Sequence, residues 1–202
     1  MSSDKGVTMF RNVALVILLA SGALAQTTPA KAPAQKKASP QMTTARKITL
    51  AESGGPAEIA KNATIFDMTD VSGMKQLRAG ASGWACYAIV DAPMCLDKEW
   101  QKWMQALMSK QPPQINSTGV AYMLRGDNGA SNTDPSATGP TAKNQWVVSP
   151  PHIMLIYQDL KMLDVYPTDP MNGGPWVMWK GTPYAHVMVP VASVKTATMP
   201  SK

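Results

Sequence analysis

Glutamate and histidine are scarce in this chain of 202 residues, and their scarcity limits the enzyme classes it can belong to. Glutamate occurs only as Glu52, Glu58 and Glu99, so the paired carboxylates of a glycoside hydrolase are disfavoured. Gly-x-Ser-x-Gly, His-Glu-x-x-His and phosphate-binding glycine loops do not occur. The sequence therefore favours a protein that is not an enzyme, without deciding the question. A hydrolase without a recognisable motif, built around one of the two histidines, is the third hypothesis.

Acidic residues are nearly missing from the first 47 positions, and this explains the net charge of +6. That stretch holds seven basic residues and one acid, Asp4, whereas the rest of the chain holds twelve residues of each sign. Proteins that bind nucleic acid need a surplus of positive charge to contact phosphates. The sequence therefore excludes nucleic acid as a partner of the main domain, and it identifies no other partner.

The first 25 residues have the pattern of a secretory signal peptide. Basic Lys5 and Arg11 precede an apolar run, 13–25, which is short for a bilayer span and ends in Ala-Leu-Ala. We expect residues 1–25 to be cleaved, which leaves no transmembrane segment in the mature chain and places it in the periplasm or outside the cell. Either Met1 or Met9 can be the true start, and an uncleaved anchor is the alternative.

The remainder divides into three segments by composition. Residues 26–47 are rich in Pro, Ala and Lys and cannot bury enough apolar surface to fold, so they predict a disordered linker. Residues 48–194 have the length and apolar content of one globular domain. Residues 195–202 are expected to form a flexible tail.

Strand patterns outnumber helix patterns in the domain. A short helix is expected within 53–63 and a longer one over 96–110, where Asp97 is a natural N-cap before an apolar face that includes Trp100. We predict an α+β fold, an antiparallel sheet of several short strands covered by one main helix, with a mostly-β sandwich as the alternative. The predicted strands are 64–68, 74–80, 84–90, 119–126, 151–157 and two within 175–191.

The chain has two cysteines, Cys86 and Cys95. In an exported protein two lone cysteines most simply form a disulfide, here between a strand and the start of the main helix. Metal ligation is the first alternative. A redox pair is the second, although such pairs usually have the closer Cys-x-x-Cys spacing.

Seven short strings between residues 62 and 191 form a specific set. They are NATIFDM (62–68), LRAGASGWACY (77–87), PMCLD (93–97), AYMLRG (121–126), SNTDP (131–135), PHIML (151–155) and GTPYAHVMVPV (181–191). As a set they resemble a group of exported bacterial proteins of unknown function. The resemblance implies an exported domain and carries over no catalytic role.

Methionine is abundant, with 15 residues. The only histidines fall in two similar strings, so that His152 and Met154, and likewise His186 and Met188, share one face of a strand. If these strands are neighbours, the four side chains can bind copper through thioether and imidazole ligands. The alternative is structural, because methionine fills irregular cores and a histidine at a strand end often only forms a hydrogen bond.

The loop over 127–150 is unusually long and polar, and we expect it to be the main contact surface. Asp127, Asn128, Asn132 and Asp134 offer oxygen ligands for calcium, although Asn-Thr-Asp-Pro is also good turn chemistry. The six tryptophans could line a carbohydrate or apolar-ligand groove, but the helix already assigns two of them to the core. Our first hypothesis is thus a non-enzymatic, exported, disulfide-stapled domain that binds a ligand or associates with the envelope, and the second is a periplasmic copper-binding protein.

Overall fold

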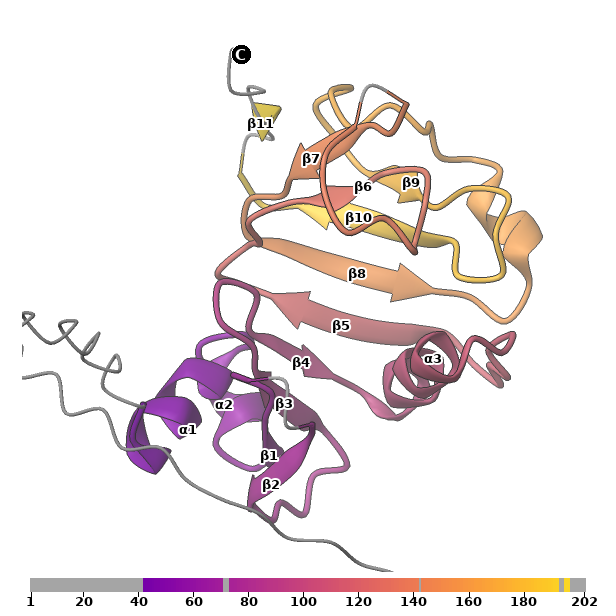
Figure 1. Ribbon diagram of the computed structural model, residues 1–202. Coiled ribbons are helices and arrows are strands. Elements are labelled where there is room, and N and C mark those ends of the chain that lie inside the picture. The colour runs from indigo at the N-terminus through magenta and orange to yellow at the C-terminus, as the bar shows by residue number, and fades with distance from the viewer. Residues whose placement is uncertain (1–41, 71–72, 142, 193–194, 197–202) are drawn as a thin grey trace, which may run out of the picture. The chain divides into compact units, whose positions relative to one another are not determined.

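The computed structural model describes residues 42–70, 73–141, 143–192 and 195–196. The expected signal peptide, most of the expected linker and residues 197–202 lie outside this part. An eight-stranded sheet dominates the fold, in the order β2-β1-β3-β4-β5-β8-β10-β9 (Figure 1). Its strands are β1 (Thr64–Asp67), β2 (Lys75–Arg78), β3 (Ala85–Ala88), β4 (Met94–Leu96), β5 (Gly119–Met123), β8 (His152–Ile156), β9 (Trp176–Met178) and β10 (His186–Pro190).

The α+β class is confirmed, but the sheet is more elaborate than predicted. β1 and β3 are parallel, because β2 turns back along one edge of β1 and the chain then enters β3 in the direction of β1. All other pairings in this sheet are antiparallel. A second sheet consists of β6 (Ala130–Ser131), β7 (Trp146–Val148) and β11 (Lys195–Thr196), so the expected tail supplies a strand.

Two short helices cover one face of the sheet at the β1–β3 end. α1 (Thr44–Glu52) begins after Thr43, whose hydroxyl accepts a hydrogen bond from the backbone N–H of Arg46, and α2 (Ala57–Ala60) follows. α1 thus begins four residues before the predicted start of the domain. Lys47, counted in the expected linker, is buried, and its Nζ lies 2.6 Å from Oδ2 of Asp67. Small apolar side chains such as Ala51 fill this part of the core.

The main helix, α3 (Lys98–Ser109), packs on β4 and β5 on the opposite face (Figure 1). The predicted N-cap at Asp97 is confirmed: Oδ1 accepts a hydrogen bond from the N–H of Trp100 at 2.9 Å. Oδ2 of the same carboxylate accepts one from the N–H of Val120 at 2.6 Å, which ties the helix to β5. Trp100 and Trp103 are buried beneath the helix. A 3-10 helix, η1 (Leu160–Leu163), closes a third cluster with β9 and β10 on the side away from α3.

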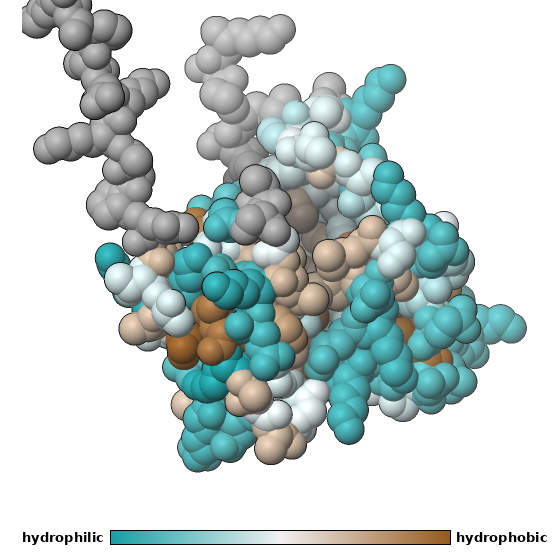
Figure 2. Space-filling model, turned by 60° about the horizontal axis from the view of Figure 1, so that its bottom comes forward, coloured by the Kyte–Doolittle hydropathy of each residue, from teal (hydrophilic) through white to brown (hydrophobic). Residues whose placement is uncertain are grey.

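The predicted disulfide between Cys86 and Cys95 is confirmed. The two cysteines are direct partners on antiparallel β3 and β4, with Cα atoms 4.0 Å apart, and both are buried under α1. On the face turned forward in Figure 2, hydrophilic side chains predominate and strongly hydrophobic ones form separate patches. In the described ranges no helix has both the length and the apolar content needed to cross a membrane.

Candidate ligand pocket

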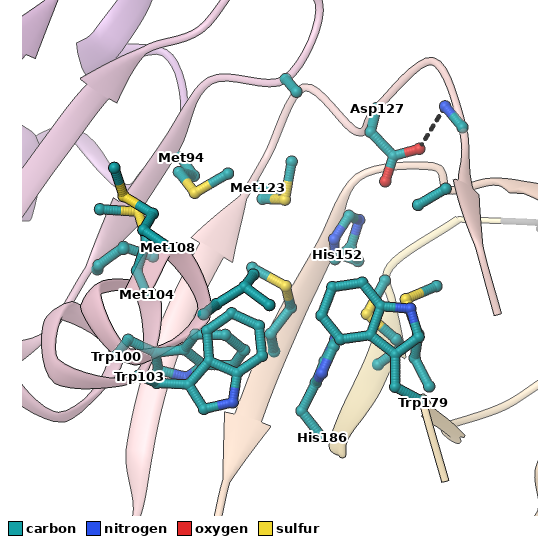
Figure 3. A pocket seen from close by; sticks show the side chains of 18 of the residues that line it. Met94, Trp100, Trp103, Met104, Met108, Met123, Asp127, His152, Trp179 and His186 are labelled. Atoms are coloured by element: carbon teal, nitrogen blue, oxygen red, sulfur yellow. Dashed lines mark hydrogen bonds between the residues drawn. The ribbon is translucent and has the colours of Figure 1, made fainter. Parts of the chain in front are cut away.

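A pocket of about 340 Å³ lies against the α3 face of the large sheet, and its volume is at the lower end of those that hold small molecules. Its walls come from α3, from β4, β5 and β8–β10, and from the start of the long loop (Figure 3). The lining residues are Met68, Ala92, Met94, Leu96, Trp100, Trp103, Met104, Leu107, Met108, Met123, Asp127, Asn128, Gly129, Ala130, His152, Met154, Met178, Trp179, His186 and Met188.

Methionine dominates this wall. Eight of the 15 methionines of the chain line the pocket, so much of the unusual methionine content is concentrated there. Methionine side chains are unbranched, flexible and polarisable, and they adapt to ligands of irregular shape. Met108 on α3 is 59% exposed although it lines the pocket, whereas Met123 and Met154 are buried. Met108 therefore lies at the opening and the other two lie inside.

The two His-x-Met strings meet in this pocket. β8 and β10 are antiparallel neighbours, Met154 and Met188 are direct Cα partners, and both histidines line the same pocket. His152 faces Pro190, however, four positions along β10 from His186. At a rise of about 3.3 Å per residue this offset is roughly 13 Å along the strand, which disfavours one ion held by both imidazoles. Copper binding by this set stays a prediction.

The His152 ring is oriented by the backbone and ends in a free acceptor. The side chain is fully buried, and Nδ1 lies 2.7 Å from the carbonyl oxygen of Pro150. A carbonyl can only accept, so Nδ1 carries the proton and Nε2 carries the lone pair. Nε2 is buried and has no hydrogen-bond partner among the described residues. Burial lowers the pKa of His152, against opposing effects of the Pro150 carbonyl and Asp127, so the ring is neutral at pH 7.

His186 is enclosed by three indole rings. Its ring centre lies 5.4 Å from those of Trp100 and Trp103 and 5.1 Å from that of Trp179, and each pair is close to perpendicular. Nδ1 donates to the carbonyl oxygen of Tyr184 at 2.9 Å. The pKa of His186 is lowered to about 4, chiefly by burial; the Tyr184 carbonyl opposes this shift and His152 adds to it. His186 is therefore also neutral at pH 7.

Trp179 is one of the wall residues that the sequence did not predict. Its backbone is left-handed, with φ at 58°, which is strained for a bulky side chain. Its N–H donates to the Asn132 carbonyl at 2.8 Å and its indole Nε1 to the Ser131 carbonyl at 2.6 Å. The ring stacks on Trp103 at a centroid distance of 5.7 Å. Strained residues cluster at functional sites. The sequence carried no signal for this conformation beyond the tryptophan itself.

The four oxygen-bearing residues of the long loop have separate tasks. Oδ1 of Asp127 accepts from the N–H groups of Gly129 and Ser149 and so closes the base of the loop, and Asn128 lines the pocket beside it. Asn132 is buried and bonded to the Trp176 indole. Asp134 caps a turn through the N–H of Ser136. In the described part of the chain, no three His, Cys, Asp or Glu side chains gather into a group that could hold a metal ion.

The pocket offers little to a nucleophilic mechanism. No serine, threonine, cysteine or lysine belongs to the described lining, and each imidazole donates Nδ1–H to a backbone carbonyl rather than to a carboxylate. A catalytic histidine of the Ser-His-Asp type needs both partners. The arrangement supports binding of an apolar molecule better than hydrolysis.

The comparisons with known proteins returned no relative. No protein-family model matches the chain, and neither the curated proteins nor the solved structures include a significant match. The function of this protein is therefore inferred from the pocket itself.

Proposed function

We propose that this protein is an exported binding domain whose pocket holds a small apolar molecule. The observation that carries the proposal is the cavity of about 340 Å³ under α3, lined almost wholly by methionine, tryptophan and other apolar side chains. Such a wall gains free energy when it exchanges water for a ligand, and methionine lets it fit several shapes. The signal-peptide pattern supports export, and the disulfide suits an oxidising compartment.

Methyl NMR of protein labelled with ¹³C at the methionine methyl groups tests this proposal directly. With 1-methylnaphthalene as the probe, we expect saturable shifts of the pocket methyl signals. The signals of Met74, Met162 and Met171, which do not line the pocket, should stay in place.

Two matched tryptophan substitutions complete this test. Met104→Trp places a larger side chain in the pocket wall and should weaken probe binding by about tenfold, because overfilled sites strain their neighbours. Met162→Trp makes the same change at a residue that is 55% exposed, outside the pocket, and should leave binding unchanged. Probe-induced shifts spread over all methionines, or equal effects of the two variants, would contradict the proposal.

Copper(I) binding is a second candidate function, favoured by one specific observation. The buried, unpaired Nε2 of His152 belongs to a ring oriented by a backbone carbonyl, as the rings of metal ligands commonly are. Met154 follows on the same strand face, and Met188 is its cross-strand partner. One imidazole with two thioethers is a soft ligand set that suits copper(I). His186 is offset along β10 and is not needed for this set.

Competition with a chromophoric copper(I) chelator tests the second candidate. We expect one copper(I) per chain, and both His152→Phe and Met154→Leu should weaken the affinity by about tenfold or more. Met162→Leu, outside the pocket, is the control and should change nothing. Equal affinity of all four proteins would exclude a copper site in the pocket.

A further inference from the structure

We propose that the pocket selects a neutral ligand with one hydrogen-bond donor, such as a hydroxyl group, on an apolar body, and that Nε2 of His152 accepts this hydrogen bond. The inference rests on the proposed function and specifies its ligand class. His152 lines the pocket from β8, where Figure 3 shows its ring among the methionine and tryptophan side chains. The side chain has no exposed surface, so a ligand group reaches Nε2 where the flexible methionine side chains around it move aside.

The tautomer and the neutral charge of the His152 ring both make its Nε2 a hydrogen-bond acceptor. The Pro150 carbonyl, 2.7 Å from Nδ1, holds the proton on that nitrogen and leaves the lone pair on Nε2. Burial keeps the ring neutral at pH 7. The other buried lining atoms without partners are the indole N–H groups of Trp100 and Trp103, which are donors. Among the fully buried atoms of the described lining that lack a partner, Nε2 of His152 is thus the acceptor, and a ligand that donates to it removes the cost of a buried, unsatisfied group.

The same end of the pocket disfavours an anionic ligand. Asp127 belongs to the lining and lies close enough to His152 to influence its pKa. No lysine or arginine belongs to the described lining, so no positive charge there compensates a carboxylate. A buried, unpaired negative charge is costly, and Asp127 adds repulsion. A neutral hydroxyl is therefore favoured over the carboxylate of a fatty or aromatic acid.

Three probes with the same fused-ring body test the inference by calorimetry at pH 7 with a metal chelator present. They are 1-naphthol, which donates, 1-methylnaphthalene, which does not, and ionised 1-naphthoate. We expect 1-naphthol to bind about tenfold more tightly than 1-methylnaphthalene, since a site built for a hydrogen bond rejects the analogue that lacks it. Naphthoate should bind at least as weakly as 1-methylnaphthalene.

Variants assign the effect to one ring. His152→Phe keeps a ring of similar size without a lone pair, so it should bring the ratio of the affinities for 1-naphthol and 1-methylnaphthalene down to about one. Tyr157→Phe, a ring substitution packed in the cluster with η1 rather than in the pocket, should keep the preference. If His152→Phe does not fold, the ¹⁵N signal of His152 Nε2 in the unmodified protein replaces it. That signal should shift with 1-naphthol and not with 1-methylnaphthalene.

The outcomes separate this inference from the proposed function. If none of the probes binds, the apolar-ligand function fails. If 1-methylnaphthalene and 1-naphthol bind equally, the function stands and the role of His152 is wrong. Tightest binding of naphthoate, or a naphthol preference that persists in His152→Phe, would also overturn it.

Discussion

At the scale of single residues, the two buried imidazoles couple the stability of the protein to pH. The pKa of His186 is lowered to about 4 in the folded protein, chiefly by burial, and that of His152 is lowered as well, whereas an unfolded histidine titrates near 6.5. The unfolded chain therefore binds more protons than the folded one between about pH 6.5 and pH 4. We expect full stability above pH 6.5 and a progressive loss toward pH 4, at no more than about 1.4 kcal/mol per pH unit for each histidine.

Unfolding in denaturant at pH 7, 6 and 5 measures this effect. His186→Phe should reduce the slope of unfolding free energy against pH, whatever its effect at pH 7. The buried carboxylate of Asp67 does not disturb the measurement. Burial raises its pKa, but Lys47 and Thr69 more than offset this and lower it below the ordinary 3.8, so its contribution is lost only at still lower pH. A stability that does not change between pH 7 and 5 would show that the imidazoles are accessible to protons in the fold.

A glycine packed against the disulfide gives a second prediction at this scale. A Cβ on Gly55 would lie 2.7 Å from Sγ of Cys95 and 2.8 Å from its Cβ, and the cross-linked cysteine cannot move away easily. Gly55→Ala should therefore destabilise the protein by on the order of 1–3 kcal/mol. A Cβ on Gly139 would meet nothing within 4 Å, so Gly139→Ala is the control and should change stability little. Equal midpoints of chemical unfolding for the two variants would contradict the prediction.

At the scale of elements, the disulfide cross-links β4 to its neighbour β3. It closes a loop across a sequence separation of nine. Cross-linking a loop of this length limits the unfolded chain and is worth about 2.5 to 3 kcal/mol. The double variant Cys86→Ala/Cys95→Ala should lose about this amount, measured by denaturant unfolding. The wild type unfolded with reductant present should lose a similar amount of unfolding free energy. Equal unfolding free energies of the oxidised and reduced wild type would show that the disulfide does not stabilise the fold.

Local patterns in the sequence predicted most helices and strands, but they did not predict which strands pair with which. Runs rich in apolar, aromatic and β-branched residues predicted β1, β2, β3, β5, β8, β9 and β10, and Asp97 predicted the start of α3. β4 and β6 are three and two residues long, too short for a period of two to register. The parallel β1–β3 pair and the pocket depend on contacts between distant segments. Trp100 and Trp103 were assigned to the core from their helix face, and they are core residues that also line the pocket.

At the scale of the whole domain, the pocket exists because α3 and the small sheet both pack on one face of the large sheet. α3 contributes Met104 and Trp103, whereas Ala130 at the start of β6 and Gly129 just before it come from the small-sheet side. The long loop that the sequence marked as a contact surface thus supplies part of the pocket wall. Its composition could not show which of its polar residues face inward, since Asn, Asp and Ser serve turns and buried hydrogen bonds equally well.

Asn132 connects the small sheet to the large one, and its loss should weaken both stability and binding. Its Nδ2 donates to Gln145 and to the Thr168 carbonyl, and its Oδ1 accepts from the buried Trp176 indole at 3.0 Å. Its backbone carbonyl holds Trp179 in the pocket wall. Asn132→Ala leaves the Trp176 N–H unpaired, so we expect a loss of on the order of 2 kcal/mol in unfolding free energy.

The same substitution tests whether the pocket is a property of the whole assembly. Because Asn132→Ala loosens the small sheet that positions Trp179, 1-methylnaphthalene should bind several-fold more weakly to it even where the variant remains folded. Asp134→Ala, two residues away, removes only a cap on the N–H of Ser136 at the surface and should change neither quantity by much. Probe affinity that survives Asn132→Ala while stability falls would mean that α3 and the large sheet form the binding site without the small sheet.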